Sequence, residues 1–131
     1  MSERPTGIRE TDDAARATAR AVLLNARTAA LGFTDPDHGV PGISRIGFAM
    51  AENGEALTLV SDLSLHTRAL RVDPRAALLV GEPAPKGDPL NSPRLSLRAT
   101  ASFVPADSAD FANLRQVWLA QIGRASCRER V

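Results

Sequence analysis

Polar side chains gather in a short segment that could bind an anion. Ser61, Ser64, His66, Thr67 and Arg68 lie where the sequence pattern predicts the start of a helix. The first turn of a helix has backbone N–H groups without intrahelical partners, and the macrodipole is positive there. Hydroxyl, imidazole and guanidinium groups at such a place match the oxygens of a phosphate. This segment is therefore a candidate phosphate site.

Other interpretations of the same residues stay open. The Ser64 hydroxyl could simply cap the helix that follows, and capping can coexist with anion binding. His66 could donate to the anion, serve as a general acid or base, or be a solvated surface histidine. No metal site is expected, because the only other histidine, His38, lies in a polar turn. The only cysteine, Cys127, gives no support for a disulfide or a thiol nucleophile.

A predicted strand upstream adds a cation to this candidate site. Its alternation puts Ile46 and Phe48 on one face and Arg45, Gly47 and Ala49 on the other. Small side chains let a flat ring approach a strand closely, and an arginine can hold a phosphate in bidentate fashion. A surface arginine on an edge strand without a ligand is the competing interpretation.

A predicted hairpin brings the two groups together. Asn53-Gly54 is the strongest short-range indication of a two-residue hairpin turn. In an antiparallel hairpin the early part of one strand lies opposite the late part of the other, so Arg45 should lie at the same end of the sheet as Ser61.

These side chains need a scaffold, which hydrophobic periodicity predicts. The expected elements are a helix over 11–27 capped by Thr11, strands over 28–34, about 43–51, 57–61, 75–81 and 94–104, a helix over 65–72, a loop over 83–93 and a helix from about 107. The strand over 75–81 is nearly all apolar, which predicts burial of both faces. Arg94 and Arg98 share the polar face of the last strand. That face is either solvated or lines a cleft from which Arg94 reaches a cofactor ring or a substrate carboxylate.

The expected fold class is mainly β (α+β), an antiparallel barrel or sandwich with flanking helices in one domain over 11–121. The near-neutral charge, formally +1, gives little electrostatic support for nucleic-acid binding. No apolar run is long enough to cross a membrane, and a cytoplasmic location is the expectation.

The last ten residues are treated separately. Residues 122–131, Ile-Gly-Arg-Ala-Ser-Cys-Arg-Glu-Arg-Val, resemble the translation of a sequencing-adaptor read-through. They carry three arginines against one glutamate, so the net charge is −1 without them. We expect the native reading frame to leave this sequence near Gln121 and a barrel that is truncated at its C-terminal side.

Several motifs in order resemble one family. They are Ile43-Ser44-Arg45-Ile46, Leu59-Val60-Ser61-Asp62-Leu63, His66-Thr67-Arg68-Ala69-Leu70, Asp73-Pro74-Arg75, Leu78-Leu79-Val80-Gly81-Glu82-Pro83, Gly87-Asp88-Pro89-Leu90 and Pro93-Arg94-Leu95. Together they resemble the pyridoxamine 5′-phosphate oxidase-like family, and within it the haem-iron utilisation proteins of the HugZ type. The oxidase itself has Arg-Lys where this chain has His66-Thr67, which disfavours vitamin B6 oxidation and favours the haem-utilisation branch.

The resemblance implies a Greek-key split β-barrel, a homodimer and FMN at the subunit interface. It places the FMN phosphate at Arg45, Ile46 and the turn of Ser61, Ser64, His66, Thr67 and Arg68, with Arg94 near the flavin ring. The implied function is FMN-dependent oxidation or reduction of a small molecule, without a catalytic side chain that we can name. The alternatives are a haem-binding or haem-degrading protein on the same fold, and a non-catalytic ligand-binding module.

Overall fold

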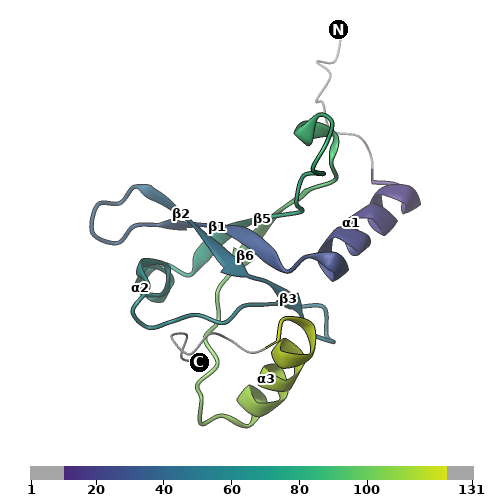
Figure 1. The fold of residues 1–131 in the computed structure, drawn as a ribbon. Coiled ribbons are helices and arrows are strands. Elements are labelled where there is room, and N and C mark those ends of the chain that lie inside the picture. Colours follow the sequence, from purple (N-terminus) through teal and green to yellow (C-terminus); the bar gives the residue numbers. More distant parts are fainter. Residues whose placement is uncertain (1–10, 124–131) are drawn as a thin grey trace, which may run out of the picture.

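Two antiparallel sheets and three α-helices make up the protein in a computed structural model, which describes residues 11–123 (Figure 1). The helices are α1 (Asp13–Asn25), α2 (Leu65–Val72) and α3 (Ala109–Gln121), and the strands are β1 (Thr28–Thr34), β2 (Pro41–Gly47), β3 (Ala49–Met50), β4 (Ala56–Leu57), β5 (Arg75–Val80) and β6 (Leu95–Thr100). The larger sheet has the strand order β2-β1-β5-β6, and β3 pairs with β4 in the smaller one. The larger sheet does not close on itself, as expected for an incomplete split barrel.

The inner face of the larger sheet carries the core. Leu31, Phe33, Ile46, Leu78 and Val80 are all buried there. Ala69 and Leu70 of α2 close one end of this cluster. Because side chains alternate along a strand, Arg45 lies on the outer face of this sheet. Its neighbour across the strand pair is Ala30 of β1.

Three expectations about the strands are wrong in detail. The predicted strand over about 43–51 begins earlier and is interrupted at Phe48, whose amide donates to the carbonyl of Arg27 rather than to a neighbouring strand. This interruption shifts the alternation, so Ala49 is buried instead of sharing the face of Arg45. The predicted strand over 57–61 is reduced to β4, and the predicted strand over 94–104 is shorter at both ends.

The strand β5 is buried on one face only, contrary to the expectation for an apolar run. Leu78 and Val80 are in the core, whereas the side chain of Leu79 is 45% exposed on the outer face. Its continuous apolar sequence predicted burial of both faces of the strand. Among the described residues, other elements cover only its inner face.

The helix ends follow local capping rules. Helix α1 is capped by Asp12, not by Thr11, because the Asp12 carboxylate accepts a hydrogen bond from the amide of Ala15 at 2.7 Å. Helix α2 has the predicted bounds and ends before Asp73-Pro74, where proline disfavours helical backbone in the residue that precedes it. The Asp73 carboxylate then binds the side chain of Arg75, with 2.7 Å between Oδ2 and Nη2.

Helix α3 is attached to the small sheet by one side chain. The Gln121 amide nitrogen donates to the carbonyl of Met50 at 2.6 Å, and its oxygen accepts from the Met50 amide at 3.1 Å. Figure 1 shows α3 beside β3, away from α2. The helix therefore covers the end of the barrel at which β2 passes into β3.

Candidate functional site

The β3–β4 hairpin forms around the predicted Asn53-Gly54 turn. Ala49 pairs with Leu57, and the turn between them closes through hydrogen bonds that join Ala51 and Glu55. The pairing ends at Ala49 and Leu57, before it reaches Arg45 and Ser61, so the approach of these two residues stays a prediction. The two segments part here, and the Thr58 hydroxyl bridges them by donating to the Gly47 carbonyl at 2.7 Å.

Residues 61–68, the Ser61–Arg68 turn, form a closely held local structure. Thr67 is fully buried, and its hydroxyl donates to the carbonyl of Ser61 at 2.6 Å. The Ser61 hydroxyl accepts from the amide of Leu63 at 3.2 Å. Ser64 is at the N-cap position of α2, but its side chain makes no capping hydrogen bond. The turn thus keeps the Ser64 hydroxyl available, while Thr67 holds the backbone in place instead of facing a ligand.

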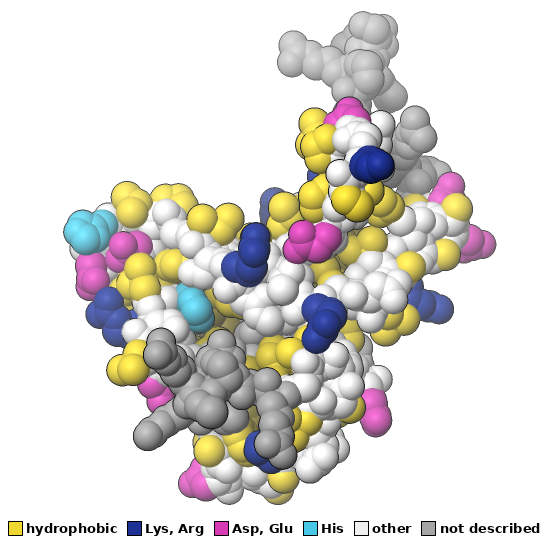
Figure 2. All heavy atoms as spheres, viewed as in Figure 1, with side chains coloured by type: hydrophobic (Ala, Val, Ile, Leu, Met, Phe, Trp, Pro, Cys, Tyr) yellow, Lys and Arg dark blue, Asp and Glu magenta, His cyan; other side chains and the backbone are white. Residues whose placement is uncertain are grey.

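His66 and Arg68 extend from α2 towards the β1–β2 hairpin. The His66 ring lies 6.4 Å from the Phe33 ring, and burial lowers the pKa of His66 below its ordinary value. The neutral imidazole can donate one hydrogen bond. Arg68 pairs with Asp37 of the hairpin at 3.4 Å, with both side chains more than half exposed. Figure 2 shows both histidines at this end of the molecule.

Neither Arg45 nor Arg94 contacts the Ser61–Arg68 turn through a hydrogen bond or ion pair among the described residues. Within residues 11–123, no hydrogen bond or ion pair joins Arg45 to the Ser61–Arg68 turn. The neighbouring Ile46 is in the core and contributes backbone only to this surface. Arg94 precedes β6 at the opposite edge of the sheet, three strand spacings or about 14 Å from β2. Its guanidinium donates to the carbonyl of Leu90 at 2.8 Å.

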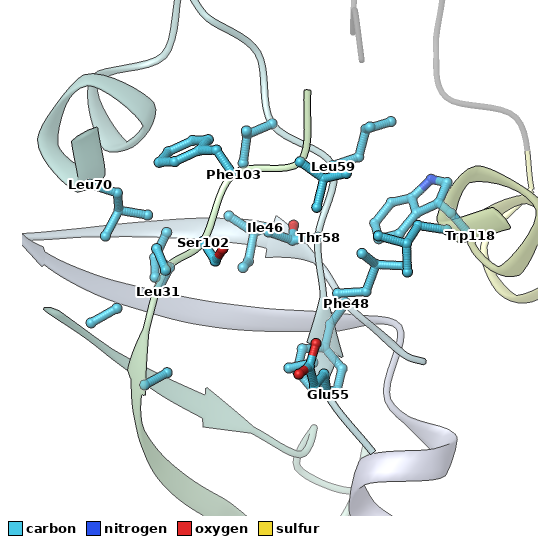
Figure 3. Close-up of a pocket in the computed structure, with 18 of the residues that line it drawn as sticks. Leu31, Ile46, Phe48, Glu55, Thr58, Leu59, Leu70, Ser102, Phe103 and Trp118 are labelled. Carbon is cyan, nitrogen blue, oxygen red and sulfur yellow. The ribbon is translucent and has the colours of Figure 1, made fainter. Parts of the chain in front are cut away.

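A large apolar cavity opens between the two sheets. Its volume is about 960 Å³, and its wall includes Phe48, Leu70, Phe103 and Trp118 (Figure 3). Figure 3 shows these side chains converging from the link between β2 and β3, from α2, from the segment after β6 and from α3. Polar groups on its wall are few, among them Glu55 and Arg115. The cavity is the interior of the open barrel, lined by the same face that carries the core.

Trp118 is the residue that the sequence interpretation missed. Its indole packs against the end of β2, where a Cβ atom on Gly47 would lie 2.6 Å from the ring carbon Cη2. Gly47 does leave room for a flat ring, as the sequence pattern predicted. The ring that occupies this space is the indole of Trp118. The presence of a single tryptophan in the sequence, on the apolar side of the last helix, was the available clue.

The family model for pyridoxamine 5′-phosphate oxidase matches residues 15–129. The chain belongs to this family. No curated protein matches the sequence. Among the described residues, no helix is long and apolar enough to cross a membrane.

Solved structures of other family-like proteins have the same fold. One is 46% identical, with a TM-score of 0.75, and the match covers 86% of this chain and 73% of the other. A haem-binding protein from Mycobacterium smegmatis is 25% identical, with a TM-score of 0.75 and coverage of 95% and 48%. The haem storage protein HutZ from Vibrio cholerae, at 22% identity, has a TM-score of 0.72 and coverage of 82% and 75%, and it supports the fold alone. The match to the Mycobacterium protein is consistent with the haem-utilisation branch that the sequence resembles, and the chain spans about half of that protein.

Proposed function

We propose that the chain binds FMN as a flavin-dependent oxidoreductase of the pyridoxamine 5′-phosphate oxidase-like class. In this proposal it acts on a small molecule in the cytoplasm as a homodimer. Family membership supports the class. The observation that carries the cofactor is the start of α2, where the Ser64 hydroxyl has no capping partner and Arg68 is exposed.

The side chains at this place fit a phosphate. Ser61 has a hydroxyl hydrogen to donate, Ser64 has no capping partner, and Arg68 has only a long, exposed contact with Asp37. The first amides of α2 add donors that no intrahelical acceptor uses. Arg45 makes no ion pair among the described residues, so its guanidinium is available to a dianion.

The flavin would supply the electron transfer, because no amino-acid side chain carries out hydride or electron chemistry of that kind. The protein's part is to hold the phosphate and to position the rest of the molecule. None of the described residues is assigned a proton-transfer role. Burial lowers the pKa of His66, and its imidazole can donate to a phosphate oxygen through a ring nitrogen in either protonation state.

The test is the affinity for FMN of an Arg45→Ala variant, measured by equilibrium dialysis. Loss of a charge-assisted partner is expected to weaken binding about 10- to 100-fold. Arg98→Ala is the matched control, because Arg98 is exposed on the same outer face but on β6. Equal FMN affinities in the wild type and both variants would exclude Arg45 from the phosphate site.

Haem binding is the second candidate, favoured by the match to the Mycobacterium haem-binding protein over nearly the whole chain. The absorption spectrum of the purified protein after incubation with each cofactor separates the two candidates. Flavin bands that survive gel filtration support the first, and a haem Soret band supports the second. A protein that retains neither would be the non-catalytic ligand-binding module.

A further inference from the structure

One edge of the larger sheet, along β6, carries unpaired backbone groups. β6 is the last strand in the order β2-β1-β5-β6, and no described strand lies on its other side. The Ala101 amide donates to the Pro74 carbonyl at 2.8 Å, which continues the β5–β6 register by one residue. Because backbone groups alternate in direction along an antiparallel strand, those of Ser96, Arg98 and Thr100 point away from β5. Among the described residues they have no hydrogen-bond partner.

The inner-face side chains of β6 are also incompletely covered. Leu95 pairs with Val80 of β5, and Leu97 pairs with Leu78. Val80 and Leu78 are buried, whereas Leu95 and Leu97 are only partly buried. The described elements thus cover the inner face at β5 better than at the β6 edge. Apolar side chains beside unpaired backbone groups favour the addition of another strand.

Strand β6 lacks most features that protect a sheet edge. It contains no proline, and its six residues pair with β5 without a bulge. Its only charged side chain is that of Arg98. The other edge is better protected, because β2 begins at Pro41 and the carbonyl of Gly47 accepts from the Thr58 hydroxyl at 2.7 Å. The edge most open to pairing is therefore β6.

The sequence outside residues 11–123 is a poor partner for this edge by composition. Residues 1–10 include Pro5 and Gly7, which disfavour a strand. Residues 124–131 carry three arginines against one glutamate, the same sign of charge as Arg98. A second copy of the chain instead offers a strand of equal length with the same outward backbone groups. The best-matched occupant is thus a second β6.

The position of the twofold axis follows from charge and strand length. Outward-pointing residues have to face each other, so the axis passes through one residue of β6. An axis at Arg98 would place two guanidinium groups directly opposite each other, which is destabilising. Axes at Leu95 or Ala99 pair fewer residues of the strand. An axis at Leu97 pairs nearly the whole strand and puts Arg98 opposite Ser96 of the second copy.

We propose that two copies of this chain pair antiparallel through β6, with Leu97 on the twofold axis. The two larger sheets become one continuous sheet across this axis. Each copy uses the same edge, so the assembly closes at a dimer. The contact is separate from the cofactor site of the proposed function, because Arg45 is on β2 at the opposite edge of the sheet.

The first test measures amide hydrogen exchange by NMR in the unaltered 131-residue chain, alongside sedimentation equilibrium. The Ser96 and Arg98 amides are unpaired in a monomer and hydrogen-bonded in the dimer. Their exchange is expected to slow as the protein concentration rises, whereas the Leu97 amide, which faces β5, is protected throughout. Fast exchange at Ser96 and Arg98 at every concentration would overturn the proposal. Slow exchange in a chain that sediments as a monomer would also overturn it, because another part of the same chain would then occupy the edge.

The second test changes the charge opposite Arg98. Ser96 is exposed, and in the dimer it faces Arg98 of the second copy twice, once on each side of the axis. Ser96→Lys is expected to raise the dimer dissociation constant about 3- to 10-fold, and Ser96→Glu to lower it by a similar factor. Sedimentation equilibrium at low salt measures both constants, and circular dichroism checks that the variants are folded.

Thr34→Lys and Thr34→Glu are the matched controls, because Thr34 is exposed on β1, away from β6. They are expected to leave the dissociation constant unchanged. Equal dissociation constants for the two Ser96 variants would overturn the β6 contact, since the dimer would then use another surface. Equal effects at Ser96 and Thr34 would overturn it too, because net charge alone would explain them. The dialysis of FMN with Arg45→Ala tests the proposed function separately, so either can fail without the other.

Discussion

Thr67 shows how one buried hydroxyl can shape the Ser61–Arg68 turn. Its hydroxyl donates to the Ser61 carbonyl at 2.6 Å. This bond ties the first turn of α2 to the chain just before the helix. The sequence predicted the polar cluster, because serine and threonine are favoured at helix starts, where their hydroxyls can bond the nearby backbone. It could not distinguish Thr67, which faces the interior, from Ser64, because the direction of a side chain on the first turn depends on the packing of the whole helix.

Replacement of Thr67 by Val is expected to destabilise the protein by about 1–3 kcal/mol. The isosteric side chain keeps the volume but leaves the Ser61 carbonyl without this donor. Urea unfolding measures the change, and Thr67→Ser, which keeps the hydroxyl, serves as the control. Unfolding free energies that differ by less than about 0.5 kcal/mol between wild type and Thr67→Val would show that this bond contributes little.

At the scale of elements, the bounds of β1 and α2 could be predicted and those of β2 to β4 could not. Strand β1 is a short apolar segment with clear boundaries, and helix α2 is stopped by Asp73-Pro74, so local sequence defines both. The break at Phe48 has no local cause in the sequence. It depends on a hydrogen bond from Phe48 to Arg27, which comes from a distant part of the chain.

The contact of α3 with β2 leads to a prediction about glycine. Gly47→Ala would put a Cβ atom within 3 Å of the Trp118 ring, and either the helix or the strand must move. We expect a loss of about 1–3 kcal/mol in unfolding free energy, as for other overpacked sites. Thermal or urea unfolding measures it.

Gly32→Ala is the matched control for this prediction. Gly32 is also in the larger sheet, but a Cβ there would meet the nearest atoms of Ala77 at 3.6 Å, an ordinary contact. We expect a change within about 0.5 kcal/mol. Equal losses in the two variants would mean that the cost comes from the strand and not from Trp118.

At the scale of the whole molecule, the split-barrel fold could be predicted, but mainly through the family resemblance. Periodicity alone indicated an antiparallel sheet with helices outside it. The expected truncation indicated an open barrel, but neither source indicated which faces would stay uncovered. The exposed Leu79 and the cavity of about 960 Å³ depend on which elements are present to cover each face.

Stability should depend on pH through His66. Burial lowers the pKa of His66 in the folded protein below 6.5, so the unfolded chain binds the proton more tightly. The unfolding free energy is therefore expected to fall as the pH drops below about 6.5 towards the folded-state pKa. Urea unfolding at pH 7.5 and 5.5 measures this fall, and His66→Gln should reduce it.

Carboxylates act in a different pH range and do not obscure this test. The pKa of Asp73 is lowered to about 2 by its hydrogen bonds with Arg75, so its contribution is present above 3.8 and is lost only as the pH falls towards 2. An identical pH dependence for wild type and His66→Gln between pH 7.5 and 5.5 would rule out His66 as its source.

The two hydrogen bonds between Gln121 and Met50 determine where α3 docks. Like two complementary bases, the amide offers a donor to the Met50 carbonyl and an acceptor to its N–H. A slide of the helix by one residue would rotate position 121 by about 100° and lose both bonds at once. One side chain therefore fixes both the height and the rotation of α3, and with them the position of Trp118.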